Sequence, residues 1–395
     1  MSRAQTAIAG ASALVVGAAV LWGVFRDDEE APPGASRPHE NVTGSSNPTA
    51  ASGLASPSPS LSPEPGPGAS SITETPAPSG GPSGGGTPGA GAQGSGAQVA
   101  SCASPTVSVA TAAQLRAALK SPKPGDTIRM EAGDYVGTFS TTASGTKARP
   151  ITLCGSADAV IDGDGIKGGY GFHLDGARYW VLSGLTVTDA QKGVVADATV
   201  GTVIEGLTVH AIGDEGIHLR GFSTDNVIRG NTVYDTGNRR EKFGEGIYIG
   251  SAHSNWCDVS NCKVDRSDRN TVEHNTIYDT TAESVDIKEG ASGGVLRNNS
   301  FDGNGLTQSG GDSWVDVKGN DWVIEGNVGI DSLLDGFQVH DVVDGWGQGN
   351  VFRDNLATVN GPGYGFAIRS QGTNTVDCSN AVSNAQKGLS NVPCS

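Results

Sequence analysis

Gly216-Ile217-His218-Leu219 and Val227-Ile228-Arg229-Gly230-Asn231-Thr232-Val233 are the two segments that decide the fold. The first reads apolar-x-apolar after a glycine, and the second reads apolar-x-x-Asn-x-apolar. The same pair of patterns returns in residues 246–277 and again in residues 285–301. Repeats of strand length are typical of a solenoid, in which every repeat position becomes a column on the surface.

The second segments align in one column, which in chain order holds Leu185, Leu207, Asn231, Asn275, Asn299, Asn327 and Asn355. Most intervals are 22 to 28 residues, and one is 44 because of an insert near residues 250–268. Asparagine tolerates the left-handed conformation of a sharp bend, and its amide can bond the asparagine one coil away. We therefore expect an inward Asn ladder with a structural role, and an all-β fold: a right-handed parallel β-helix solenoid over residues 102–395.

The first segments align on pairs of apolar residues that period-two alternation turns inward. These pairs are Phe172/Leu174, Val194/Ala196, Ile217/Leu219, Ile247/Ile249, Val285/Ile287, Val315/Val317, Phe337/Val339 and Phe366/Ile368. Ahead of the coils, Thr111-Ala112-Ala113-Gln114 is a capping box and predicts a helix. We expect this N-terminal capping helix to cover the strand edges at the open end of the solenoid.

Residues 1–26 predict a membrane anchor, because residues 7–25 carry no charge and are long enough to span a bilayer. A cleaved signal peptide is the alternative, but the small-x-small sites do not follow the apolar run. Residues 27–101 are rich in Pro, Gly and Ser and predict a disordered linker. We expect an exported protein, either anchored to the bacterial plasma membrane with an extracellular β-helix domain or secreted after cleavage.

The six cysteines agree with export, and their simplest pairing is Cys102–Cys154, Cys257–Cys262 and Cys378–Cys394. The net charge of −16 argues against nucleic acid as a partner, because phosphate binding needs a basic face. An anionic ligand therefore needs a local basic strip or a bridging cation. We expect a monomer.

The residue between the two members of each inward pair points outward, and so does the residue directly after the pair. The second of these columns is rich in cations: Arg220, Lys288, Lys318, His340 and Arg369. Neighbouring coils lie ~4.8 Å apart, so Lys288 above Lys318 costs repulsion unless an anion lies between or over them. Asp286 and Asp316 flank the two lysines. The column predicts an anion-binding site with a perturbed lysine, and the alternative is a solvated face of Asp–Lys pairs.

Acidic residues stand just before several of these strands: Glu215, Glu245, Glu283 and Asp335. Carboxylate oxygens at corresponding places on one sheet edge are ligands that Ca²⁺ accepts. The pattern therefore predicts Ca²⁺ as a cofactor, with ordinary acidic turn residues as the alternative.

The opening of the domain combines the helical segment 113–119 with Pro124-Gly125-Asp126, Gly133-Asp134-Tyr135 and Pro150-Ile151. This combination resembles the N-terminal pattern of the polysaccharide lyase family that contains chondroitinase B and alginate lyases. It implies a β-helix enzyme with a Lys base, an Arg one coil later, and Ca²⁺ held by acidic and Asn side chains.

Two further matches carry the catalytic part of this resemblance. Glu283 and Lys288 are five residues apart, like the calcium-ligand Glu and the base of that family. Residues 315–319 resemble its arginine strand with Lys318 in place of Arg, and Thr281 stands where the family has a second Glu. The implied activity is cleavage of an anionic, uronate-containing polysaccharide by β-elimination.

β-Elimination needs a base for the proton next to the sugar carboxylate, whose charge must be neutralised first. Lys288 is the expected base, because a neighbouring ammonium such as Lys318, or a metal, lowers the pKa of a lysine. The remaining roles are a leaving-group proton from Tyr248 or His218, substrate binding by Arg220, Asp316, His340 and Arg369, and Ca²⁺ binding by Glu245, Glu283 and Asp286.

Two other functions stay open at this point. One is a glycosidase that uses Asp286 and Asp316, because adjacent coils bring carboxyl groups near the roughly 5–5.5 Å of a retaining mechanism. The other is a non-catalytic surface protein whose cationic column binds a polyanion or another carbohydrate.

Overall fold

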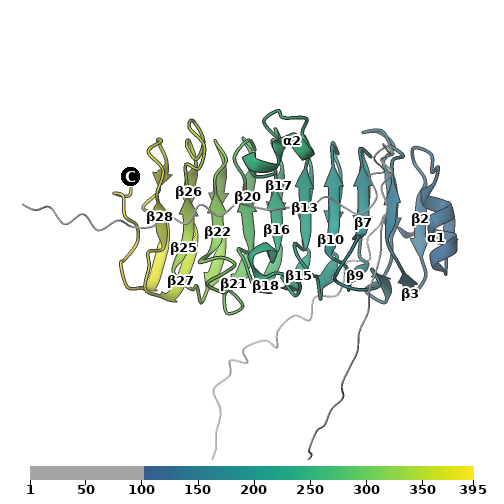
Figure 1. Ribbon diagram of the computed structural model, residues 1–395, viewed down its shortest axis with the longest axis horizontal. Helices are drawn as coiled ribbons and strands as arrows, with labels where there is room; N and C mark the ends of the chain where they lie inside the picture. The colour runs from purple at the N-terminus through teal and green to yellow at the C-terminus, as the bar shows by residue number, and fades with distance from the viewer. Residues whose placement is uncertain (1–101) are drawn as a thin grey trace, which may run out of the picture. The chain divides into compact units, whose positions relative to one another are not determined.

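The computed structural model describes residues 102–395, and these form an all-β parallel β-helix. Each coil adds one strand to each of three parallel sheets, and the coils stack from the blue end to the yellow end of Figure 1. The predicted parallel β-helix is therefore confirmed. The predicted anchor at residues 1–26 and linker at residues 27–101 lie outside the described residues.

The three sheets are named here A, B and C. Sheet A contains, in spatial order, β1 (Val107–Val109), β2 (Thr127–Met130), β5 (Ile151–Cys154), β8 (Trp180–Ser183), β11 (Val203–Glu205), β14 (Val227–Arg229), β17 (Thr271–Glu273), β20 (Val295–Arg297), β23 (Val323–Glu325), β26 (Val351–Arg353) and β29 (Thr375–Val376). Sheet B contains β3 (Gly133–Val136), β6 (Ala159–Asp162), β9 (Thr186–Thr188), β12 (Thr208–His210), β15 (Thr232–Thr236), β18 (Thr276–Thr280), β21 (Ser300–Asp302), β24 (Val328–Ile330), β27 (Leu356–Gly361) and β30 (Ala381–Ala385). Sheet C contains β4 (Phe139–Thr141), β7 (Tyr170–Asp175), β10 (Lys192–Asp197), β13 (Ile217–Arg220), β16 (Ile247–Ile249), β19 (Val285–Ile287), β22 (Ser313–Val317), β25 (Asp335–Val339) and β28 (Phe366–Ile368).

Helices are short and lie outside the sheets. Helix α1 (Ala112–Leu119) begins after its N-cap Thr111, whose side chain accepts a hydrogen bond from the amide of Gln114, as the capping box predicts. It packs against β1, β3 and β4 at the blue end of Figure 1, and its role in covering strand edges stays a prediction. The 3-10 turn η2 (Glu241–Phe243) precedes β16. The insert after β16 contains η3 (His253–Asn255) and α2 (Trp256–Val259).

The register of sheet C is the one that the inward pairs predict. In β19 and β22, for example, Val285, Asp286 and Ile287 lie beside Val315, Asp316 and Val317. Both members of every predicted pair are buried in the core. The residues between the pairs therefore form one outward column across the sheet: His173, Val195, His218, Tyr248, Asp286, Asp316, Gln338 and Ala367.

The predicted Asn ladder is present, with one correction to its geometry. Asn275 donates through Nδ2 to Oδ1 of Asn299 over 2.9 Å, and the ladder continues by the same bond from coil to coil. The left-handed residue is not the ladder asparagine but its predecessor, such as Gly230 or His274. The buried ladder asparagines Asn231 and Asn275 are not in the left-handed region. The predecessor makes the bend.

A second Asn ladder was not predicted from the sequence. Asn226 donates through Nδ2 to Oδ1 of Asn270 over 3.0 Å, and both residues are buried. The backbone N–H of Asn226 also donates to Oδ1 of Asn270, and further along the solenoid the backbone N–H of Asn350 donates in the same way to Oδ1 of Asn374. The two ladders supply hydrogen bonds to backbone groups that lie in turns and therefore have no partner in a neighbouring strand.

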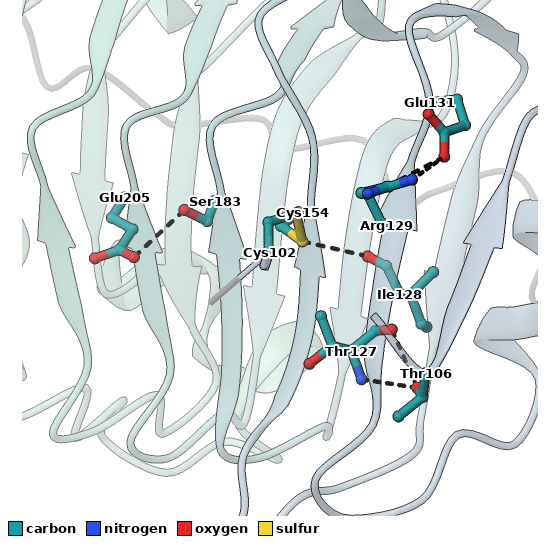
Figure 2. Close-up of a disulfide and its surroundings, with 9 residues drawn as sticks. All are labelled: Cys102, Thr106, Thr127, Ile128, Arg129, Glu131, Cys154, Ser183 and Glu205. Carbon is teal, nitrogen blue, oxygen red and sulfur yellow. Dashed lines mark hydrogen bonds and ion pairs between the residues drawn. A yellow bond between two sulfur atoms is a disulfide. The ribbon is translucent and has the colours of Figure 1, made fainter. Parts of the chain in front are cut away.

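All three predicted disulfides are present: Cys102–Cys154, Cys257–Cys262 and Cys378–Cys394. Figure 2 shows the first of them at the end of β5, next to the strand in which Thr127 exchanges hydrogen bonds with Thr106. This disulfide fixes the start of the described chain to the first coils. Cys257–Cys262 closes the insert, and Cys378–Cys394 ties down the last coil.

Within residues 102–395, no helix has the length and apolar character that crossing a membrane requires.

Candidate active site on sheet C

The outward face of sheet C brings together most of the predicted site residues in one group, here called the central cluster. Its members are Glu245, Tyr248, Glu283, Asp286, Lys288, Asp316 and Lys318. Each comes from one of three positions relative to an inward pair: just before it, within it, or just after it. Parallel register stacks these positions in columns across β16, β19 and β22.

Asp286 lies at the centre of this cluster and binds both predicted lysines. Its Oδ2 lies 2.8 Å from Nζ of Lys288, and its Oδ1 lies 2.9 Å from Nζ of Lys318. Lys318 also reaches Oδ2 of Asp316 over 2.7 Å. The repulsion expected between the stacked lysines is thus relieved by the carboxylate between them.

The two aspartate–lysine contacts fix the charge of Lys318. Burial opposes its ammonium form, but Asp286 and Asp316 outweigh burial and hold the pKa of Lys318 above its usual value. Burial likewise opposes the charge of Asp316, yet His340 and Lys318 hold the pKa of that carboxyl well below its usual range. Lys318 is therefore a permanent cation in this site, which suits it to binding an anion and excludes it as a base near neutral pH.

Three carboxyl groups converge beside the lysines. One oxygen from each of Glu245, Glu283 and Asp286 lies within 4.8 Å of the others. Burial, then the charge of Asp286, raises the pKa of Glu283 to about 8. Burial, then the charge of Glu215, raises the pKa of Glu245 well above its usual range. Oε2 of Glu245 is buried and has no hydrogen-bond partner among the residues that the structure describes.

The central cluster holds more carboxyl groups than lysines. Glu245, Glu283, Asp286 and Asp316 face the ammonium groups of Lys288 and Lys318, so four potential negative charges meet two positive ones. The excess of two is balanced either by two protons or by one divalent cation. Buried oxygen ligands of this kind fit the hard cation Ca²⁺.

Tyr248 and His218 lie on the other side of Lys288. Nζ of Lys288 lies 4.9 Å from the centre of the Tyr248 ring, a cation–π distance. The ring of His218 meets that of Tyr248 edge-on, with centres 4.4 Å apart. Nε2 of His218 lies 2.9 Å from the carbonyl oxygen of Gly250. Of the two predicted proton donors, Tyr248 therefore contacts the predicted base, and His218 contacts Tyr248.

Of the residues predicted to bind substrate, Asp316 lies in the central cluster, and Arg220, His340 and Arg369 lie in two flanking clusters. Upstream, Nε of Arg220 lies 2.7 Å from Asp197, and Nη2 donates to the hydroxyl of Tyr170 over 3.0 Å. Burial opposes the charge of Asp197, but His173 and Arg220 outweigh it and hold the pKa of that carboxyl below its usual range.

Downstream, the flanking cluster contains Asp335, Gln338, His340 and Arg369. Arg369 pairs with Asp335, and Gln338 accepts from His340 over 2.8 Å. Asp335 is thus held by an arginine away from the central carboxyl groups. From Arg220 on β13 to Arg369 after β28 the face spans five strand spacings, or about 24 Å.

Two contacts were missed in the sequence. Lys192 stands two residues before an inward pair, in the column that also holds the acids Glu215, Glu245, Glu283 and Asp335, and its Nζ lies 3.0 Å from Oε1 of Glu215. The column itself was the signal, because a lysine among acids predicts a pair. The insert is held by Glu289, which accepts from the amide of His253 over 2.6 Å. No periodicity predicts that contact.

Comparisons with known proteins agree with this architecture. A family profile described as "Pel9A-like, right handed beta helix region" matches residues 96–255, and one described as "Right handed beta helix region" matches residues 263–392. The solved alginate lyase from Paenibacillus sp. str. FPU-7 is 38% identical, with 72% of this chain and 96% of that chain covered and a TM-score of 0.68. No curated protein matches the chain.

More distant structures share only the fold. Pectate lyase Pel9A is 15% identical, with 75% of this chain and 82% of that chain covered and a TM-score of 0.46. A mannuronic acid specific polysaccharide family 6 lyase from human gut microbiota is 16% identical, with 66% of each chain covered and a TM-score of 0.43. Since the alignment at 38% identity spans nearly all of the Paenibacillus enzyme, the chain belongs to the family of right-handed parallel β-helix proteins that includes this alginate lyase.

Proposed function

We propose that the protein is an extracellular lyase that cleaves an anionic, uronate-containing polysaccharide by β-elimination. The observation that carries the proposal is the convergence of Lys288, Lys318 and Tyr248 around Asp286 on the outward face of sheet C. Membership in the family of the Paenibacillus alginate lyase supports the same reaction class.

The first requirement of the reaction is a cation for the sugar carboxylate. Lys318 meets it because Asp286 and Asp316 keep it charged. Neutralising the carboxylate makes the adjacent C5 proton more acidic. Arg220 and Arg369, in the flanking clusters, are placed to bind carboxylates of neighbouring sugars along the same face.

The second requirement is a base and a proton donor. Lys288, whose Nζ lies 2.8 Å from Asp286 and 4.9 Å from the Tyr248 ring, is the proposed acceptor of the C5 proton. The electron pair of the C5–H bond forms a C4=C5 double bond, and the C4–O bond breaks. Tyr248, in contact with Lys288, supplies the proton to the leaving oxygen, with His218 as the other candidate.

We also propose that Glu245, Glu283 and Asp286 hold Ca²⁺. The excess of carboxyl groups and the buried, unbonded Oε2 of Glu245 support this fit. When bound, the ion would add positive charge beside the sugar carboxylate. Ca²⁺ is expected to raise the thermal midpoint of the wild-type protein and to raise that of the Glu245→Gln variant much less. A midpoint that does not respond to Ca²⁺ would remove the ion from the proposal.

The glycosidase alternative is less well supported. Asp286 and Asp316 both bind Nζ of Lys318, and the pKa of Asp316 is lowered. A retaining glycosidase needs one carboxylic acid that keeps its proton near neutral pH, and the lowered pKa of Asp316 disfavours it in that role. The remaining alternative is a non-catalytic protein in which the same cations bind a polyanion.

A panel of alginate, chondroitin and pectate, each with Ca²⁺ and with a chelator, tests the proposal. A lyase produces an unsaturated sugar, so ultraviolet absorbance and reducing ends increase together. Reducing ends without absorbance would identify a glycosidase. Binding of the polymers with neither signal would identify a non-catalytic protein.

Export and anchoring are proposed on separate grounds. Three disulfides in residues 102–395 fit an oxidising compartment. We propose that residues 1–26 anchor the protein to the bacterial plasma membrane and that the β-helix acts as a monomer outside. Release of the protein by salt or carbonate from isolated membranes would contradict the anchor, and gel filtration of detergent-solubilised protein tests the monomer.

A further inference from the structure

We propose that Lys192 and Glu215 are positioning residues that hold Tyr248 in place through His218. The inference rests on the proposed function, because Tyr248 is the proton donor there. It concerns residues on β10 and β13, one to two coils away from the strand that carries Tyr248.

A continuous chain of contacts carries the proposal. Nζ of Lys192 lies 3.0 Å from Oε1 of Glu215, and the same oxygen lies 3.7 Å from Nδ1 of His218. His218 then reaches the coil of Tyr248 twice, through the carbonyl of Gly250 at 2.9 Å and through the edge-on ring contact at 4.4 Å.

The contact with Gly250 determines which nitrogen of His218 carries a proton. A carbonyl oxygen only accepts, so Nε2 of His218 is the donor. Nδ1 then faces Oε1 of Glu215 at 3.7 Å. The hydrogen bond to Gly250 and the ring contact with Tyr248 orient the imidazole, and Glu215 lies against its second nitrogen.

Burial makes a purely stabilising role for the pair a poor explanation. The side chains of Lys192 and Glu215 are each only 4% exposed, and that of His218 is fully buried. Removing two charges from water costs about as much as their attraction returns, so apolar side chains of similar volume would hold the coils together as well. The charged pair instead orients the neighbouring ring: Lys192 holds the carboxylate of Glu215, and that carboxylate holds the imidazole of His218.

Steady-state kinetics of Lys192→Met and Glu215→Gln test the positioning role. Both variants should lower kcat about tenfold to a hundredfold, since a small misplacement of a catalytic group has effects of this size, while KM changes less than about twofold. Lys192→Arg should restore most of the loss. The matched control is Arg239→Met, which removes the ion pair of Arg239 with the buried Asp214, next to Glu215 in the sequence, and should leave kcat unchanged.

The double variant Lys192→Met/Glu215→Gln leaves no unpaired charge and serves if a single variant fails to fold. An unchanged kcat in these variants, or a raised KM with unchanged kcat, would overturn the proposal. Nitrogen NMR of labelled histidines gives a readout that does not need activity. The proton on Nε2 of His218, assigned with His218→Gln, should exchange at least about tenfold faster in Lys192→Met.

The two measurements separate the two proposals. If the wild-type protein cleaves no polyuronate, the proposed lyase function fails, and the NMR experiment still tests the positioning of His218. An exchange rate identical in Lys192→Met and wild type would overturn the positioning role even if the protein is a lyase.

Discussion

Glu283 gives the most quantitative prediction about the site. Its pKa rises from 4.5 to about 8 on folding, chiefly through burial and then through Asp286. The folded protein therefore holds this proton more tightly than the unfolded chain does. The resulting contribution to stability is fully present below pH 4.5, falls as the pH rises, and is lost above pH 8. At about 1.4 kcal/mol per pKa unit, the change across this window is up to about 5 kcal/mol.

The assay compares wild type with Glu283→Gln, which keeps the shape of the side chain and removes its titration. Denaturant unfolding in a chelator, at several pH values from 5 to 9, gives the free energy of unfolding of each protein. The free energy of unfolding of wild type minus that of Glu283→Gln should decrease as the pH rises. Saturating Ca²⁺ should flatten it, because the ion would replace the proton. A difference that is flat in the chelator, or that rises with pH, would refute the reasoning.

Two further predictions concern the scaffold. Asn299→Leu should destabilise the protein by roughly 3 kcal/mol or more, because it removes buried hydrogen bonds to both neighbouring coils. Asn231→Leu, nearer the end of the ladder, should destabilise the protein less. Thermal unfolding of the two variants measures this difference. On sheet A, Arg297 lies between Glu273 and Glu325 in register. Arg297→Glu should therefore lower stability by about 1 kcal/mol at low salt and less at high salt, and equal losses at both would contradict this.

Most of the fold was predictable because its pattern is local and repeats. The period-two pairs, such as Val285 and Ile287, determine which side chains face the core, and their repetition determines the register of sheet C. The position of the bends was not predictable in the same way. Asn275 and His274 are both compatible with a left-handed conformation, and only the direction of the ladder amide shows that His274 adopts it.

The columns of the candidate site were predictable, but the partners within them were not. Lys288 and Lys318 carry long side chains, and both turn back to Asp286 rather than extending straight outward. Which carboxylate a lysine selects depends on the total charge of the cluster, which no single column contains. The contact of Glu289 with His253 depends on how the insert folds over the coil, which its irregular sequence does not indicate.

The most direct test of the account compares wild type with Lys288→Ala on the polyuronate that the panel identifies. Ultraviolet absorbance from unsaturated products should increase with wild type and with Lys387→Ala, a control lysine that lies over Tyr364, outside the central cluster. With Lys288→Ala it should not increase. An unchanged rate of absorbance increase in a folded Lys288→Ala protein would contradict the assignment of Lys288 as the base.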